Sequence, residues 1–399
     1  MIQPKQMEIV KPSSEELNIY AIVSITILFG TAIVSVMPIS SALILGSDEG
    51  FELVKAFLEH RGFHLYSQIW SDQPPLFTSC LDFLFKIGGE FAIWTRLLTT
   101  LLGGFLLGCL YEMVRYRSRR VAAAFAILLL ASAPAYLSLS VSVMQEVPAF
   151  AFAMASAWCL FRWENSKGWH WLTISGALLM VALLIKFTAG LILPAMAIEF
   201  ILVCKQLEGT CVKYFKSACF WFIGILAAFE TLSPFLDFGD YNKLVGSHTT
   251  AIAIEGMSKA SDFPFPLLAL GIEHWEVWLC AVIGIRIIFV RRIWREVAFP
   301  ITLLFTVTIV HLAHRPWWYY YYLHHAIPLV WLSGIAIREL MIRLKEIPYE
   351  KTNSILRSYA AAFLIALLIL RSGTRVMGEV KEARNAPKIQ GNAMLAHIA

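Results

Sequence analysis

The feature that most constrains this sequence is the repetition of apolar segments about 20 residues long, separated by short basic loops. A helix of about 20 apolar residues is long enough to cross the hydrocarbon layer of a bilayer. Hydrophobic residues make up 58% of the 399 residues and charged residues only 15%, whereas soluble domains have about 25%. One soluble core cannot bury so much apolar surface. We therefore predict an all-α polytopic membrane protein.

The apolar segments predict about 11 transmembrane helices in a single transmembrane domain over 1–399, with no separate soluble domain. The length of the first apolar segment and the acidic residues before it favour a retained helix over a signal peptide. The predicted spans are 19–45, 92–114, 121–140, 148–163, 170–185, 187–204, 217–234, 272–290, 297–313, 319–342 and 355–371.

The segment 74–89 is too short for a span and follows Pro-Pro, so we predict an interfacial helix there. The basic clusters at 115–120, 162–167, 205–216, 291–295 and 343–351 then all fall on one side of the membrane. Because cytoplasmic loops are enriched in Lys and Arg, this pattern predicts a cytoplasmic N-terminus. It also predicts an external loop at 46–91 with interfacial helices, and an external C-terminal tail at 372–399. The basic residues of the tail do not fit, so a missing or extra helix near the end stays open.

Charge and cysteine content exclude several other classes of function. A formal net charge of +5 is ordinary for a membrane protein and indicates no nucleic-acid partner. The seven Cys are scattered, with no CxxC pair and no zinc spacing, which indicates neither a disulfide framework nor a metal site. No cofactor is predicted with certainty, and a requirement for a divalent metal stays open.

Ionisable residues gather at the predicted external ends of the spans, where charge at membrane depth is costly and often functional. Asp48 and Glu49 follow the first span, although they can also simply begin a helix. Glu146 can be a solvated loop acid, and Lys186 and Arg96 can extend to the lipid headgroups.

Two further stretches contain candidate residues. In WSDQPPLF (70–77), Trp70, Asp72 and Gln73 precede Pro-Pro, which by itself only signals the start of a helix, and Trp70 can be an interfacial anchor. In HLAHRPWWYYYYLHH (311–325) most rings suit an aromatic belt. The neighbouring cationic residues can nevertheless hold a phosphate, and they are His311, His314 and Arg315.

The order of these features resembles the GT-C class of membrane glycosyltransferases. It is most similar to the branch with protein O-mannosyltransferases and lipid A aminoarabinose transferases. The features are the acid pair, an amphipathic helix, x-Pro-Pro-Leu about 25 residues later, an Arg-led span, an external acid and a Lys between two spans. The resemblance covers 19–205, and beyond that only the RPWWYYYYLHHAIPL block.

The resemblance implies roles for the matching residues. Asp48 is expected to be the catalytic base, and Glu49, its neighbour in the acid pair, is assigned to the catalytic residues with it. Gln73 stands where the family has Lys or His, and Asp72 beside it makes this region more negative. The substrate is therefore expected to differ. We assign Trp70, Asp72, Gln73 and Glu146 to the donor or acceptor site, and we assign the donor phosphate to Lys186, Arg96, Arg315, His314 and His311.

The resemblance also implies an activity, that of an inverting hexosyl- or pentosyltransferase. Its donor is expected to be a polyprenyl-phosphate sugar and its acceptor a hydroxyl of a lipid, glycan or protein, at the external or periplasmic face of the cell membrane. Two alternatives remain from the sequence: a transporter or flippase of lipid-linked sugars, and a polysaccharide polymerase or ligase. A transporter should show broken helices near the midplane and repeated halves, which this sequence does not show clearly.

Overall fold

The computed structural model describes residues 18–43, 45, 48–89, 92–206, 210–238, 271, 273–313, 318–345 and 352–388. Within them the chain is helical and forms no β-strand, only two isolated β-bridges, which confirms the predicted all-α class. The elements are α1 (Ile19–Val36), α2 (Glu49–His60), α3 (Leu76–Gly88), α4 (Ala92–Ala131), α5 (Pro134–Val141), α6 (Glu146–Ser166), α7 (Trp169–Ile185), η1 (Phe187–Ile192), α8 (Leu193–Gln206), α9 (Cys211–Leu232), η2 (Ser233–Phe235), α12 (Trp275–Arg291), η4 (Trp294–Glu296), α13 (Ala298–Ala313), η5 (Tyr319–Tyr321), α14 (Tyr322–Lys345) and α15 (Thr352–Asn385).

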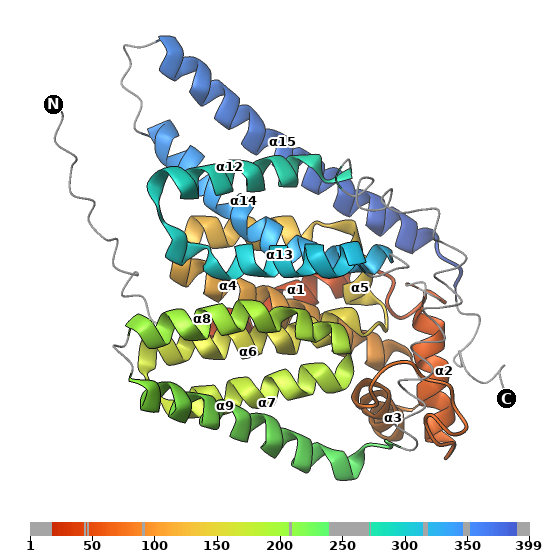
Figure 1. Cartoon of the computed structure of the whole chain (residues 1–399). Coiled ribbons are helices and arrows are strands. Elements are labelled where there is room, and N and C mark those ends of the chain that lie inside the picture. Colours follow the sequence, from red (N-terminus) through yellow and green to blue (C-terminus); the bar gives the residue numbers. More distant parts are fainter. Residues whose placement is uncertain are drawn as a thin grey trace.

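The long helices form a bundle, and α2 runs across one end of it, which we call the α2–α3 end (Figure 1). Six helices of the described residues are long and apolar enough to cross a membrane. A seventh span results if α5 and α6, which meet at 101°, count as one. The shorter helices α7 and α13 are also apolar. The predicted number of eleven spans is not reached by this criterion and stays a prediction.

The predicted helix at 74–89 is present as α3, whose 13 residues begin directly after Pro75. Proline at a helix start supplies a preset φ and lacks an N–H that has no helical partner there. A helix of this length is ~20 Å long, too short for a hydrocarbon layer of ~30 Å. It packs against α2 through a buried face that includes Leu81 and Phe85.

Three predicted boundaries differ from the structure. The loop expected at 115–120 is helical except at Arg119, where a φ of 70° joins two helices within α4. The span expected at 121–140 stops at Ala131, because Pro134 cannot continue a helix interior, and the chain starts again as α5. The tail expected from residue 372 begins as helix, since α15 continues to Asn385.

Two glycines let α1 approach α4 closely. A Cβ atom added to Gly104 would lie 2.8 Å from the Cα atom of Thr26, and one added to Gly108 would lie 2.8 Å from that of Ile22. Small residues four apart on one helix face allow backbones to meet in this way, and the contact gains dispersion energy that lipid does not supply. The same holds for α7 against α9 at Gly176 and Gly224.

An ion-pair network lies at the end of the bundle opposite to the α2–α3 end. It contains Arg117 on α4, Glu164 on α6, Glu199 on α8 and Arg295 on η4. Glu164 follows Glu146 by five turns of α6, which places the two ~27 Å apart. The basic clusters at 115–120, 162–167 and 291–295 therefore meet at one end. This agrees with the one-sided distribution that the sequence predicts.

The end of α15 touches the segment between α1 and α2. The N–H of Leu43 donates to the carbonyl of Pro387 at 2.7 Å, and Ala42 and Lys388 form an antiparallel bridge. Arg384 Nε donates to the carbonyl of Val36 at 3.2 Å. The segment that leads to Asp48 is thus held from outside by residues far along the chain.

Candidate active site

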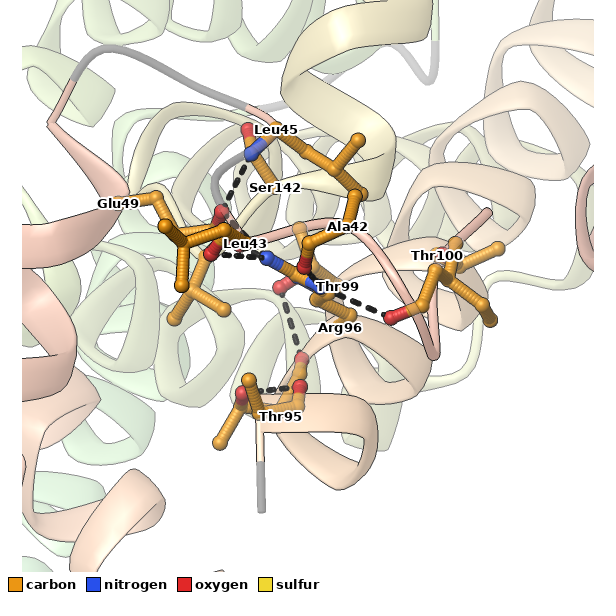
Figure 2. A network of polar contacts seen from close by, with 12 residues as sticks. Ala42, Leu43, Leu45, Glu49, Thr95, Arg96, Thr99, Thr100 and Ser142 are labelled. Carbon is orange, nitrogen blue, oxygen red and sulfur yellow. Dashed lines mark hydrogen bonds and ion pairs between the residues drawn. The ribbon is translucent and has the colours of Figure 1, made fainter. Parts of the chain in front are cut away.

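Glu49 and Arg96 form an ion pair that joins the start of α2 to the start of α4, and both are 0% exposed (Figure 2). Arg96 Nε and Nη2 donate to the two carboxylate oxygens of Glu49, each at 2.8 Å. The carboxylate also accepts from the N–H groups of Leu45 at 2.7 Å and Val143 at 3.0 Å. Because both charges are paired and hydrogen-bonded, this burial is tolerated.

Arg96 uses its remaining donors on the segment before α2. Its Nη1 donates to the carbonyls of Ile39 at 2.9 Å and Ala42 at 2.8 Å, and its Nη2 donates to that of Leu43 at 3.2 Å (Figure 2). All five N–H groups of a guanidinium are then engaged. We expected Arg96 to bind the donor phosphate. In the structure it holds the segment that leads to Asp48, so we no longer propose Arg96 as a phosphate ligand.

Asp48 is positioned by this anchor, because it immediately precedes Glu49. Asp48 and Glu49 do stand at the start of α2, as the alternative from the sequence expected, although the Asp48 side chain forms no capping hydrogen bond with the helix. The residue is half-buried, and its carboxylate is close enough to Tyr320 of η5 to act on that side chain electrostatically. Asp48 therefore faces the same region as η5.

Lys186 and Glu146 form a second buried ion pair. Lys186 lies between α7 and η1 and is 8% exposed, and Glu146 begins α6 and is 1% exposed. The ammonium group also lies 5.0 Å from the centre of the Tyr320 ring, a cation–π distance. Lys186 thus points into the protein, and the alternative in which it extends to the lipid headgroups is excluded.

Tyr320 lies close to Lys186 and to three of the carboxylates that the sequence singled out. Asp48, Asp72 and Glu146 all lie within electrostatic range of its hydroxyl. The structure therefore brings together the start of α2, the loop before α3, the start of α6 and the end of α7. None of these four elements is adjacent to η5 in the sequence.

The buried side of α2 extends this polar region. Glu52 accepts hydrogen bonds from Lys55 Nζ at 2.8 Å and Gln145 Nε2 at 2.9 Å, and it lies within electrostatic range of Lys186. None of these three residues was predicted from the sequence. A signal was present, because Glu49 and Glu52 are three residues apart and share the helix face that carries the apolar side chains.

The residues of the 70–77 stretch have different positions. Asp72 accepts a hydrogen bond from Gln73 Nε2 at 3.0 Å, and the Gln73 carbonyl accepts from the hydroxyl of Tyr66 at 2.8 Å. Gln73 is half-buried. Trp70 is 59% exposed and lies outside the buried cluster. Asp72 is thus the member of this stretch for which proximity to Tyr320 is shown.

His311 lies in a buried aromatic cluster rather than alone. Its Nε2 is 2.8 Å from Nδ1 of His324, and its ring stacks on Tyr321 at 4.5 Å. His324 also lies within electrostatic range of Lys186. His324 and Tyr320 were not predicted from the sequence, because both stand in a run whose aromatic residues suit a membrane belt. His314 and Arg315 lie outside the described residues.

The far end of α2 carries a perturbed carboxyl group. Glu59 accepts a hydrogen bond from the Ser79 hydroxyl of α3 at 3.0 Å, while its other oxygen is buried without a partner among the described residues. Burial raises the pKa of Glu59 to about 7, and the negative charges of Asp82 and Asp237 add to the effect. This site is separate from the Lys186 pair.

The sequence matches a family described as dolichyl-phosphate-mannose-protein mannosyltransferase over residues 72–237. That range includes Asp72, Gln73, Arg96, Glu146 and Lys186, and begins after Asp48. No curated protein matches the chain by sequence.

Solved structures share the fold. ArnT from Cupriavidus metallidurans, bound to undecaprenyl phosphate, matches with a TM-score of 0.53 and 12% identity over 92% of this chain and 75% of that one. Archaeal AglB from Archaeoglobus fulgidus is an oligosaccharyltransferase, solved in complex with an inhibitory peptide and a dolichol-phosphate. It matches with a TM-score of 0.56 and 12% identity, over 93% of this chain and 56% of that one. Arabinosyltransferase EmbB from Mycobacterium smegmatis matches with a TM-score of 0.53 and 12% identity, over 95% of this chain and 42% of that one. The chain thus spans less than two thirds of the length of AglB and of EmbB. The predicted resemblance to GT-C glycosyltransferases is confirmed.

Proposed function

We propose that this protein is a membrane glycosyltransferase that moves a sugar from a polyprenyl-phosphate-linked donor to an acceptor hydroxyl. The family match over 72–237 supports this proposal, as do two structural neighbours that bind a lipid phosphate, ArnT with undecaprenyl phosphate and AglB with dolichol-phosphate. The acceptor is a hydroxyl of a lipid, glycan or protein. Transfer takes place at the external face of the membrane, where sugars must arrive on a lipid carrier.

The observation that carries the proposal is that the anchored Asp48 and the buried Lys186 both lie close to Tyr320. The Glu49–Arg96 pair fixes the position of Asp48, the residue before α2. The ammonium group of Lys186 is held by its ion pair with Glu146. A carboxylate and a cation on rigid elements are the two charges that transfer from a phosphate leaving group requires.

The reaction is a single displacement. Asp48 accepts the proton of the acceptor hydroxyl, whose oxygen attacks the anomeric carbon. The bond between that carbon and the phosphate oxygen breaks, and its electron pair stays on the phosphate. Lys186 stabilises the charge that develops there. Because the nucleophile enters opposite to the leaving group, the anomeric configuration inverts.

The loop before α3 adjusts the donor site. Asp72 and Gln73 contact each other, so the position where related proteins carry a positive charge is here neutral beside an acid. We propose that these two residues, with Glu146, contact the sugar or the acceptor and set the choice of substrate. Trp70, which is exposed, lies at the rim.

Sugar transfer by the purified protein tests the proposal. Radiolabelled polyprenyl-phosphate sugars are incubated with candidate acceptors and wild-type protein, Asp48→Asn, or the matched control Glu230→Gln, which removes an exposed charge on α9. Asn preserves the shape of Asp48 but accepts no proton, so we expect a loss of about 10²–10⁴-fold with donor binding retained. Full activity of Asp48→Asn would contradict the mechanism. Movement of labelled lipid across vesicles without transfer would instead support a flippase.

A further inference from the structure

A pair of buried histidines lies beside the candidate site. His324 is 0% exposed in the first turn of α14, and His311 is 2% exposed in the last turn of α13. Their rings meet through His324 Nδ1 and His311 Nε2 at 2.8 Å. The His324 ring also stacks on Phe150 of α6, with centroids 4.5 Å apart and planes at 22°. The ring of His324 is therefore fixed by three helices.

The other nitrogen of His324 is unsatisfied. Nε2 is buried and has no hydrogen-bond partner among the described residues. A buried polar atom without a partner costs about 1–3 kcal/mol, so its position requires an explanation. The ring lies within electrostatic range of Lys186, whose ammonium group belongs to the candidate site. A ligand bound at that site could form the missing hydrogen bond with His324 Nε2. Such a ligand would explain both why this nitrogen has no partner in the protein and why it lies near Lys186.

The contact between the rings determines which kind of ligand fits. Two neutral imidazoles can share only one proton at that contact. If His311 Nε2 carries it, His324 Nδ1 is the acceptor and the proton of His324 resides on Nε2. Nε2 is then a donor near a lysine and in the first turn of a helix of 24 residues, where the helix dipole favours negative charge. This combination suits an anion.

We propose that His324 Nε2 donates a hydrogen bond to the phosphate of the lipid-linked donor, and that His311 positions His324 in the tautomer that allows it. The inference rests on the proposed glycosyl transfer and adds a ligand to it. When the bond to the anomeric carbon breaks, a phosphodiester with one negative charge becomes a phosphomonoester with up to two. A fixed donor therefore binds the leaving group more strongly than the substrate, which is how binding accelerates a reaction.

Binding of undecaprenyl phosphate to the purified full-length protein in detergent tests the ligand role without knowledge of the sugar. The informative variants are His324→Gln, whose amide nitrogen reproduces the position of Nε2, and His324→Asn, whose amide reproduces only that of Nδ1. We expect His324→Asn to weaken binding by about 10- to 100-fold, the size of a hydrogen bond to a charged group. His324→Gln should stay within a few-fold of wild type. The matched control is His325→Asn, in the adjacent buried residue, whose Nδ1 faces the carbonyl of Tyr321.

The role of His311 is tested in the same assay. His311→Phe should weaken binding in the wild-type background and add little to His324→Asn, because both changes remove the same donor. In the transfer reaction, His324→Asn should lower kcat more than it raises KM for the donor.

The outcomes separate this inference from the proposed function. Equal affinities of the Asn and Gln variants, whether both normal or both reduced, would refute the ligand role. If His324→Asn does not fold, His324→Gln is compared with His311→Phe instead. Normal binding of undecaprenyl phosphate by His311→Phe would then also refute the ligand role. Wild-type protein that binds undecaprenyl phosphate with the expected order of variants but transfers no sugar would refute the transferase and leave the ligand role standing.

Discussion

Asp48 and Glu49 are neighbours in the sequence, but their side chains have different surroundings. Glu49 is fully enclosed by Arg96 and backbone N–H groups, whereas Asp48 is half-buried. From the sequence we predicted catalytic roles for both. In the structure Glu49 is paired with Arg96, so we propose a catalytic role for Asp48 alone and a positioning role for Glu49.

Removal of the Glu49 charge should therefore affect stability. Glu49→Gln leaves the Arg96 guanidinium buried without its counter-charge, a change that costs about 3–5 kcal/mol in buried pairs. We expect a clearly lower melting temperature in detergent for Glu49→Gln and an unchanged one for Asp48→Asn. The double variant Glu49→Gln/Arg96→Met should lose less than the sum of the single changes. Equal melting temperatures for the two single variants would show that the pair is not a structural anchor.

Glu59 should make stability depend on pH. Its pKa is raised from 4.5 to about 7, so between these values the folded protein binds a proton that the unfolded chain does not. The free energy of unfolding therefore falls as pH rises from about 4.5 to about 7, and this group has no further effect outside that window. Glu59→Gln removes the carboxylate, so it should raise the melting temperature more at pH 8 than at pH 5. Glu230→Gln should change it equally at both, and the same uniform result for Glu59→Gln would contradict the assignment.

At the scale of elements, local signals predicted some helices and not others. Pro74 and Pro75 mark the start of α3 because proline acts on its own backbone. The bend between α5 and α6 and the end of α15 were not predicted, because hydrophobicity reports where a chain is apolar and not where its helix stops. Residues 372–385 lack a long apolar run, yet they contain good helix formers such as Glu, Lys and Arg.

The contact between α7 and α9 depends on glycine. A Cβ atom on Gly224 would lie 1.9 Å from the carbonyl oxygen of Thr173, a backbone atom that cannot move aside. We expect Gly224→Ala to separate the helices and lower the melting temperature. The control is Gly373→Ala on α15, where nothing lies within 4 Å, and it should be neutral or stabilising by up to about 1 kcal/mol. If both variants melt alike, the close packing of α9 has little effect on stability.

At the scale of the whole molecule, the distribution of basic residues predicted that five basic clusters share one side. The structure brings three of them together, those at 115–120, 162–167 and 291–295, and it pairs Arg117 and Arg295 with buried glutamates on α6 and α8. Sequence reasoning could place the candidate site at one end of the bundle, since its charges interrupt apolar segments. The partners of each charge come from helices far apart in the chain, so the sequence alone could not identify them.

Membrane topology can be tested by labelling single cysteines in a cysteine-free background. Exposed positions at the two ends are suitable: Arg120, Asn165 and Arg292 at one, and Ser67 and Glu230 at the other. Because basic loops remain in the cytoplasm, a membrane-impermeant thiol reagent should label the second group in intact cells and the first only after permeabilisation. Labelling of position 120 from outside would reverse the proposed orientation of the active site.

The bridge between Ala42 and Lys388 has a consequence for how the protein is made. The ribosome produces the segment that leads to Asp48 early and its outer support, Pro387 and Lys388, much later. At about 5–20 residues per second the interval is on the order of tens of seconds. Once Lys186 has been made, the nascent chain has the acidic residues and the lysine of the candidate site but still lacks the contacts that support the segment before Asp48. Under the proposed function, sugar transfer should therefore begin only after α15 has been made, so that unfinished chains do not consume lipid-linked sugar.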